Sequence, residues 1–230
     1  MFSSTSNILM AEHVSKQVKS GENTITILRE INLAVKKGET LAILGTSGSG
    51  KTTLLTLLAG IDKPTAGNIF FNSAPLNHLN EDQLAAIRRN HVGFIFQSFH
   101  LLPTMTALEN VSLPLDICGI PFHEARARAT EWLVRVGLQE RLNHYPLTLS
   151  GGEQQRVAIA RAFINQPDII FADEMTGNLD TNTGEKITEI LFTLNKNFQT
   201  TLILVTHDQT LAKQCQRQLT LHEGVLTPCL

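Results

Sequence analysis

The stretch that decides the fold is Gly45-Thr46-Ser47-Gly48-Ser49-Gly50-Lys51-Thr52. It follows the nearly all-apolar run Thr40–Leu44 and opens the amphipathic run Lys51–Ala59, after which Gly60 stands where a left-handed residue commonly ends a helix. A buried strand, a glycine-rich loop and a helix are therefore predicted in this order. This is the context in which such a loop forms a P-loop, a cradle for the phosphates of a nucleoside triphosphate.

The chemistry expected of this loop follows from its residue types. Glycines let backbone N–H groups converge on phosphate oxygens, and the start of the helix adds a favourable partial charge. Lys51 is expected to reach the β- and γ-phosphates, and the Thr52 hydroxyl to hold Mg²⁺. We expect ATP to be bound by residues of the loop and the first helical turn: Gly45, Thr46, Ser47, Gly48, Ser49, Gly50, Lys51, Thr52 and Thr53. The alternative is a glycine-rich turn that binds nothing.

Outward from the loop, short apolar runs alternate with helical stretches, which predicts an α/β fold with a mainly parallel sheet. Further strands are expected at Val92–Phe96, Asp168–Ala172 and Thr201–Thr206, each apolar on both faces. Residues 7–35 predict an antiparallel β edge, and 106–136 are helical in pattern, with Gly137 as the stop. We expect one domain over 1–230, with an α/β core over 7–96 and 167–230 and a helical subdomain over 97–166.

Composition excludes several classes of function. The 230 residues carry 19 Lys and Arg against 21 Asp and Glu, so the net charge of −2 gives no electrostatic case for binding nucleic acid. No apolar run approaches the roughly 20 residues of a membrane-spanning helix, and the first ten residues show neither the basic nor the apolar region of an export signal. Cys118, Cys215 and Cys229 lack metal-ligand spacing and are expected to be reduced thiols.

Two acidic residues end the apolar run at 168–172. Asp173 and Glu174 would lie at the carboxyl end of a buried strand, where open α/β sheets bind ligands. Asp173 suits the organisation of Mg²⁺, and Glu174 the polarisation of an attacking water. An ordinary helix cap explains the pair equally well when it is considered alone, and the P-loop in the same chain favours the catalytic interpretation.

A second loop of interest is Leu149-Ser150-Gly151-Gly152-Glu153-Gln154-Gln155-Arg156, followed by VAIARAF. Ser150 with Glu153 three residues later predicts a capping box at a helix start whose free N–H groups form a second anion site. An ordinary capped helix explains Ser150 and Glu153, but it does not explain the two glycines between them.

With these motifs the sequence resembles the ATP-binding-cassette (ABC) ATPases. The resemblance implies the P-loop ATPase fold of that family, with a mainly parallel core sheet, an antiparallel β edge and a helical signature subdomain. It also implies that two copies dimerise around two ATP molecules, with Ser150, Gly151, Gly152 and Glu153 contacting the ATP of the opposite copy. Gln97 would be the Q-loop glutamine and a Mg²⁺ ligand beside Thr52 and Asp173. Asn178, Leu179 and Asp180 would form the D-loop, and His207 would be a catalytic switch histidine that helps Glu174 orient water. The other seven histidines are expected to have no catalytic role.

A finer resemblance is to the branch that serves lipoprotein release and macrolide export. It rests on GFIFQSF at 93–99, the LLPTMTALENVSLPL segment that follows, and ADEMTGNLD at 172–180. It implies an ATPase that drives a separate integral membrane permease, in transport or mechanotransmission, through residues 97–114. It also implies a cytoplasmic location on the inner face of the cell membrane. A soluble ABC ATPase of assembly or repair is the alternative, and a P-loop kinase would have no use for the second loop.

The chain departs from the family pattern at two positions. The family usually stacks an aromatic side chain on adenine, whereas no Phe, Tyr or Trp occurs between Phe2 and Phe70, and the matching position is Val18. This predicts weaker selectivity for adenine. Met175 stands where the branch commonly has proline, and a slightly looser turn after Glu174 is expected, with a small effect on rate.

Overall fold

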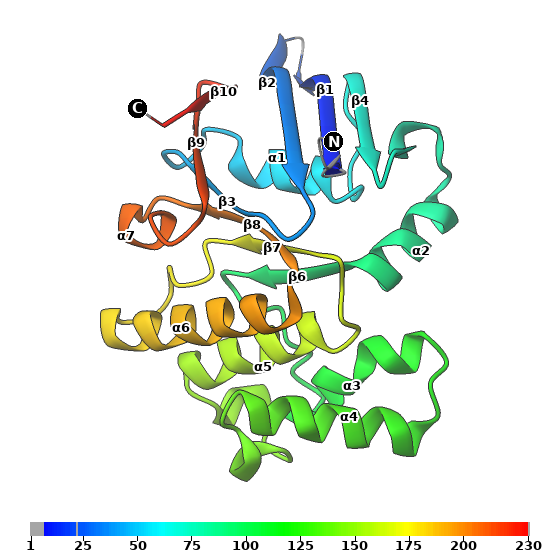
Figure 1. Cartoon of the computed structure of the whole chain (residues 1–230), viewed down its shortest axis with the longest axis vertical. Coiled ribbons are helices and arrows are strands. Elements are labelled where there is room, and N and C mark those ends of the chain that lie inside the picture. The colour runs from blue at the N-terminus through cyan, green and yellow to red at the C-terminus, as the bar shows by residue number, and fades with distance from the viewer. Residues whose placement is uncertain (1–6, 22, 230) are drawn as a thin grey trace, which may run out of the picture. The chain divides into compact units, whose positions relative to one another are not determined.

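The P-loop is presented by a mainly parallel sheet. The computed structural model describes residues 7–21 and 23–229, and the chain folds into two compact units: the first unit comprises 1–88 with 201–230, and the second comprises 89–200. In the first unit β3 (Thr40–Leu44) lies between β8 (Thr201–Thr206) and β9 (Arg217–His222) and is parallel to both, as Figure 1 shows, while β10 (Val225–Pro228) pairs antiparallel with β9.

The central strands of this sheet are buried because they are apolar apart from their terminal threonines. All six residues of β8 and all but the last of β3 are buried. Helix α1 (Lys51–Leu58) follows the P-loop and buries Leu54, Leu55, Leu57 and Leu58. The short helix α7 (Gln209–Ala212) follows β8. The sheet thus fixes the P-loop at the carboxyl end of a buried strand.

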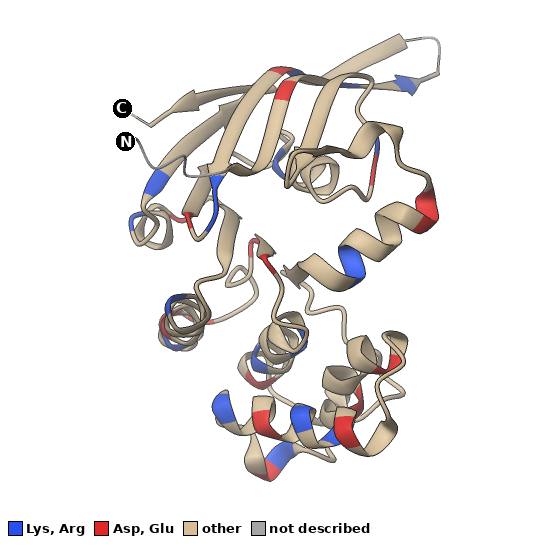
Figure 2. Ribbon diagram, turned by 45° about the vertical axis from the view of Figure 1, so that its right-hand side comes forward, with Lys and Arg blue, Asp and Glu red and all other residues tan. Residues whose placement is uncertain are grey.

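A second, antiparallel sheet of the first unit has the order β2-β1-β4-β5. Its strands are β1 (Asn7–Ser20), β2 (Asn23–Lys36), β4 (Ala66–Phe71) and β5 (Ala74–Pro75). The 3₁₀ turn η1 (Leu76–His78) leads to helix α2 (Glu81–His91), which ends in the second unit. In both units, basic and acidic residues are interspersed along the ribbon (Figure 2).

The second unit combines a parallel strand pair with a group of helices (Figure 1). Strand β6 (Val92–Phe96) pairs in parallel with β7 (Ile169–Asp173). The helices are α3 (Ala107–Ile117), α4 (Phe122–Arg135), α5 (Gly151–Phe163) and α6 (Thr181–Phe198), with 3₁₀ turns η2 (Gln139–Arg141) and η3 (Pro146–Thr148). Their core includes Trp132, whose ring centroid lies 5.7 Å from that of Phe163 and 5.1 Å from that of Phe198.

The structure confirms the strands predicted at 40–44, 92–96 and 201–206. The strand predicted at 168–172 lies one residue later, at 169–173, and the helix predicted at 51–59 ends at Leu58. The prediction that β6 is buried on both faces was wrong, since only Gly93 and Ile95 of this strand are buried. The helical stretch over 106–136 divides into α3 and α4, because Gly119 is left-handed (φ 76°) and Pro121 directly precedes the second helix. The subdomain boundaries at 97 and 166 stay a prediction.

Within the described part of the chain, no helix combines the length and the apolar character that crossing a bilayer requires.

Candidate functional site

The P-loop backbone is bare where a phosphate would approach. Gly50 is the N-cap of α1 with φ 99°, a left-handed conformation that side chains disfavour. At Gly45 a Cβ atom would come within 2.6 Å of both the Leu221 carbonyl oxygen and the Ser49 hydroxyl. Both positions therefore require glycine, one for its conformation and one for the close approach.

Two polar side chains of the loop, those of Ser49 and Lys51, are buried. Lys51 is only 5% exposed, and its ammonium donates to the carbonyl oxygens of Gly45 at 2.9 Å and Thr46 at 3.0 Å. The Ser49 hydroxyl is buried without a hydrogen-bond partner. A buried hydroxyl without a partner costs about 1–3 kcal/mol. An oxygen-rich anion in the loop would supply the missing acceptor, so the loop fits a phosphate group.

His207 lies close to the loop within the first unit. It is exposed and directly follows β8, in a turn where Asp208 N donates to the Thr206 hydroxyl at 3.0 Å. The Asp208 carboxylate accepts from Thr210 N at 2.7 Å and caps α7. A cavity of about 510 Å³ is lined by Gly45, Thr46 and His207 together with residues of β9. The structure thus places the predicted switch histidine and the start of the P-loop on one cavity.

Other predicted nucleotide contacts of the first unit are on its surface. The Thr52 side chain is exposed in the first turn of α1, and Thr53 is half-buried behind it. Val18 lies on β1 opposite Ile25 of β2, and these side chains are 37% and 50% exposed. They form a small apolar surface without an aromatic ring.

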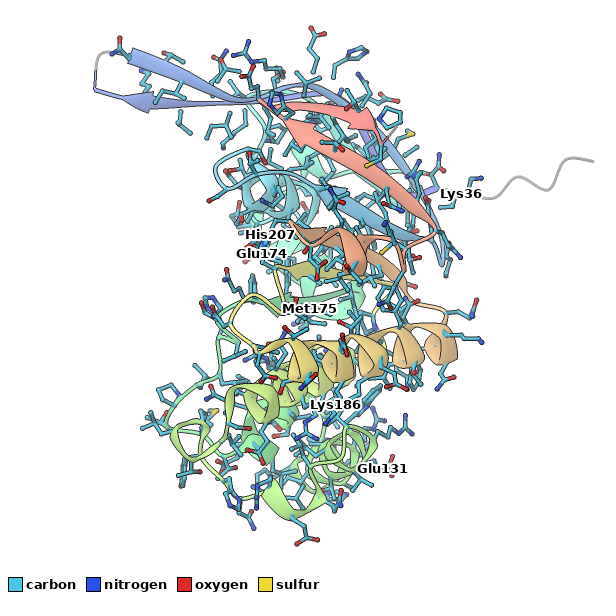
Figure 3. All side chains as sticks on the ribbon, turned by 90° about the vertical axis from the view of Figure 1, so that its left-hand side faces the viewer. Lys36, Glu131, Glu174, Met175, Lys186 and His207 are labelled. Carbon is cyan, nitrogen blue, oxygen red and sulfur yellow. The ribbon has the colours of Figure 1, made fainter. Side chains whose placement is uncertain are left out.

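In the second unit, the two acidic residues stand where β7 ends, as Figure 3 shows for Glu174. Asp173 is the last residue of the strand, and Glu174 turns the chain with φ 42°. The turn closes through a hydrogen bond of 2.9 Å from Gly177 N to the Glu174 carbonyl oxygen. Met175 is buried at 1% exposure and anchors this turn.

The capping box predicted at the start of α5 is confirmed. The Ser150 hydroxyl accepts from Glu153 N at 3.3 Å, and Glu153 Oε2 accepts from Ser150 N at 2.8 Å. Arg141 Nε donates to the second carboxylate oxygen of Glu153 at 2.9 Å. The bond from Ser150 N and then the bond from Arg141 lower the pKa of Glu153 to about 2. Both Glu153 oxygens are used within the chain, so this residue shapes the helix start.

The two glycines of this loop lie against the segment that follows β7. A Cβ atom at Gly152 would be 2.5 Å from Thr183 Cγ2, and one at Gly151 would be 3.2 Å from Leu179 Cδ2. Asp180 is the N-cap of α6 and accepts from Thr183 N at 3.0 Å, and its side-chain and backbone hydrogen bonds with Thr183 lower the pKa of its carboxyl. The start of α5 and the segment that follows β7 are thus packed together in one unit.

Gln97 directly follows β6 and is bonded to Asn178, in the same segment after β7. Its Nε2 donates to Asn178 Oδ1 at 3.3 Å, and Asn178 Nδ2 donates to the Gln97 carbonyl oxygen at 3.0 Å. Two and three residues further on, Phe99 and His100 both have positive φ, at 59° and 49°. The Arg161 guanidinium donates to both of their carbonyl oxygens, at 2.7 and 2.6 Å.

The contacts of Arg161 and Asn178 with the segment after β6 were not predicted from the sequence. The motif around Asn178 was visible in the sequence, but its bonds to Gln97 were not. For Arg161 the sequence holds no signal, because both acceptors are main-chain carbonyls, which every residue carries. Among the described residues no group of three or more His, Cys, Asp or Glu side chains is placed to hold a metal ion.

A P-loop between a parallel strand and a helix defines the class of P-loop nucleoside triphosphatases. A model of the ABC transporter family matches residues 28–177, and the chain belongs to this family. It is the ATP-binding cassette of an ABC transporter and an ATPase.

Relatives of known sequence and structure agree with this assignment. The chain is 51% identical to the ABC transporter ATP-binding protein YbbA of Escherichia coli K12, over 96% of each chain. It is 46% identical to the lipoprotein-releasing system ATP-binding protein LolD of Idiomarina loihiensis, over 96% of this chain and 97% of LolD. The cassette MJ0796, solved as a dimer in a post-hydrolysis state with ADP and phosphate, matches with a TM-score of 0.89 and 44% identity, over 95% of this chain and 96% of that one. The family, the fold and the ATPase activity expected from the sequence are thereby confirmed.

Proposed function

We propose that this cassette hydrolyses ATP with the residues predicted from the sequence and drives a separate membrane permease. The P-loop carries the proposal, with bare backbone at Gly45 and Gly50, the buried Lys51 and the Ser49 hydroxyl that lacks a partner. When ATP binds, Lys51 exchanges loop carbonyls for phosphate oxygens, which are stronger acceptors because they are charged.

The donor set for a metal fits Mg²⁺. Thr52 offers a hydroxyl, Gln97 a carboxamide and Asp173 a carboxylate, and such oxygen ligands suit this hard cation. Few protein carboxylates are needed, since Mg²⁺ usually keeps waters and substrate phosphates as further ligands. When bound, the ion neutralises charge that develops on the transferred phosphoryl group.

Glu174 and His207 act on the attacking water in this proposal. Glu174 accepts its proton, and its position is set by the closed turn after β7. His207 donates a hydrogen bond to the γ-phosphate, from a turn that Asp208 and Thr206 hold in place. A positioned base of this kind is worth roughly 10²- to 10⁴-fold in rate.

A second copy of the chain completes each site. We assign Ser150, Gly151 and Gly152 to the γ-phosphate of the ATP held by the partner, because the start of α5 offers N–H groups beside two residues without side chains. Glu153 contributes by holding Ser150 in its capping geometry. The dimeric, nucleotide-bound state of MJ0796 supports this arrangement.

The permease is expected to contact residues 97–114 of the cassette, which would lie at the cytoplasmic face of the cell membrane. Leu102 in this segment is 41% exposed, and hydrogen bonds hold the backbone of the loop around it. The fully buried Asn110 side chain accepts from Leu102 N at 2.8 Å and donates to the carbonyl oxygens of Leu102, Met105 and Thr106 at 3.0–3.1 Å. A loop held in this way that presents an apolar residue suits a stable protein contact. The similarity to LolD supports a permease of the lipoprotein-release and macrolide-export branch.

The catalytic assignment is tested with Glu174→Gln. We expect the variant to bind ATP and to form a stable dimer in size-exclusion chromatography with Mg-ATP, while turnover falls by roughly 10²- to 10⁴-fold. Glu185→Gln, at an exposed position of α6, is the matched control and should keep full turnover. Full ATPase activity of Glu174→Gln would refute the assignment.

The permease assignment is tested by affinity purification from solubilised membranes. A multi-span membrane protein should co-purify with the chain and be lost with Leu102→Asp, whereas Leu147→Asp, at a position that is 89% exposed on η3, should retain it. A cytosolic partner with no membrane protein would favour a non-transport ABC ATPase.

A further inference from the structure

Gln97 and Asn178 form a reciprocal pair although 81 positions separate them in the sequence. Gln97 Nε2 donates to Asn178 Oδ1 at 3.3 Å, and Asn178 Nδ2 donates to the main-chain oxygen of Gln97 at 3.0 Å. The D-loop therefore holds the Gln97 residue through both its backbone and its side chain. Neither residue is deeply buried, so this pair contributes orientation more than stability.

The pair determines which end of the Gln97 carboxamide faces outward. The two ends of a carboxamide have nearly the same shape, but only the oxygen can bind a cation. A main-chain carbonyl only accepts hydrogen bonds, so Asn178 must direct its NH₂ group to it. The Asn178 oxygen then faces Gln97 and requires a donor there. Only Nε2 of Gln97 satisfies it, and Oε1 is left for another partner.

Gly177 provides the space for this contact. A Cβ atom at this position would stand 2.8 Å from Gln97 Nε2 and 3.3 Å from Gln97 Cδ. A side chain would push the carboxamide away from the D-loop. Gly177 therefore leaves space for the Gln97 carboxamide, and Asn178 forms hydrogen bonds with it.

We propose that Asn178 is a positioning residue that fixes the Gln97 carboxamide with its oxygen presented to the Mg²⁺ of bound ATP. This inference rests on the proposed function, in which Gln97 is a Mg²⁺ ligand. It gives the D-loop a role inside its own subunit, since a movement of residues 177–178 changes the presentation of Gln97. Residues that orient metal ligands typically change metal affinity by about 10- to 100-fold when mutated.

The first test uses the nucleotide-free protein. In ¹⁵N-labelled protein, the side-chain NH₂ signal of Gln97 is assigned by its loss in Gln97→Glu. We expect slow hydrogen exchange for this group, and faster exchange with a shift towards free carboxamide in Asn178→Ala. Asn178→Asp keeps one acceptor but sets a carboxylate against the Gln97 carbonyl oxygen, so it should release Gln97 as well. Asn182→Ala, at an exposed position of α6, is the control.

The second test measures metal dependence without turnover. In the Glu174→Gln background, the fraction of dimer is followed against Mg²⁺ concentration at fixed ATP. We expect Asn178→Ala to raise the half-saturating Mg²⁺ concentration by about tenfold or more, with an unchanged melting temperature. Gln97→Ala should raise it at least as far, and Gln97→Ala/Asn178→Ala should match Gln97→Ala.

The outcomes separate this inference from the proposed function. If Glu174→Gln forms no dimer with Mg-ATP, the proposed function fails, and the NMR test still decides whether Asn178 holds Gln97. If the dimer forms and Asn178→Ala leaves the half-saturating Mg²⁺ concentration unchanged, the inference is overturned. A double variant clearly weaker than Gln97→Ala would also overturn it, because Asn178 would then act by another route.

Discussion

Replacing Arg161 should destabilise the protein far more than an ordinary helix-surface substitution. The Arg161 guanidinium donates two short hydrogen bonds, at 2.7 Å to the Phe99 carbonyl oxygen and at 2.6 Å to that of His100. Both acceptor residues have positive φ, a conformation that costs free energy and needs support from its surroundings. In Arg161→Ala both bonds are lost, and the loop after Gln97 loses the group that holds it.

The expected loss follows from these contacts. A hydrogen bond to a charged group contributes about 1.5–3 kcal/mol, which gives about 3–6 kcal/mol for the pair. Two effects reduce the sum. Burial lowers the pKa of Arg161, so removing the charged group also removes a desolvation cost. The released loop also relaxes its left-handed backbone. We therefore expect the free energy of unfolding to fall by about 2–4 kcal/mol.

Urea denaturation followed by circular dichroism measures this change, and two further variants control it. Arg156 lies on the same helix, but its bonds to the Val136 and Gly137 carbonyl oxygens are long, at 3.3 and 3.4 Å, so Arg156→Ala should cost about 1 kcal/mol or less. Arg161→Lys should fall between wild type and Arg161→Ala, because an ammonium group cannot reproduce the fork of a guanidinium. If Arg161→Ala costs no more than Arg156→Ala, the reasoning is refuted.

Three further predictions concern single side chains. Glu153 is ionised in the fold with a pKa of about 2, below its ordinary value of 4.5, so it stabilises the protein above pH 4.5 and the contribution is lost as pH falls towards 2. The difference in free energy of unfolding between wild type and Glu153→Gln, about 3 kcal/mol at pH 7, should therefore shrink over this window in urea titrations. A difference independent of pH would contradict this prediction. Burial raises the pKa of the Cys215 thiol to about 12. At pH 8 a thiol reagent should therefore modify Cys215 at least about 100-fold more slowly than the exposed Cys118. Cys118→Ser should remove a fast phase of the modification reaction and Cys215→Ser the slow phase. Val18→Tyr should strengthen ATP binding by about 1–3 kcal/mol through stacking on adenine and raise the preference for ATP over GTP; a wild type that already hydrolyses ATP much better than GTP, together with a variant that changes nothing, would rule out this role of Val18.

Local features of the site were predictable because their signals lie within a few residues of each other. The capping box needs only Ser150 and, three positions later, Glu153, and both behave as predicted. The strand before the P-loop was equally clear, since Thr40–Leu44 is apolar and glycines follow at once. In each case the side chains that determine the geometry are neighbours along the chain.

Features that join distant segments could not be predicted in the same way. Arg161 contacts carbonyl oxygens 61 and 62 positions earlier, and Asn178 contacts Gln97 81 positions earlier. The acceptors for Arg161 are main-chain groups present at every position, so no residue type marks them. The break between α3 and α4 was missed for a different reason, because the helical periodicity on both sides outweighed the glycine and the proline between them.

The turn after β7 shows how a departure from a family pattern is compensated by packing. The sequence predicted that Met175, in place of proline, loosens this turn and slightly affects the rate, and the effect on rate stays a prediction. Proline restricts the residue before it to extended conformations, whereas Glu174 has φ 42°. Methionine permits this conformation, and the burial of its own side chain, at 1% exposure, contributes about 1.5–3 kcal/mol. The turn is thus held by a buried side chain and by the hydrogen bond from Gly177 N to the Glu174 carbonyl oxygen. Because Gly177 also lies against the Gln97 carboxamide, any change that loosens the packing of Met175 should displace both Glu174 and Gln97.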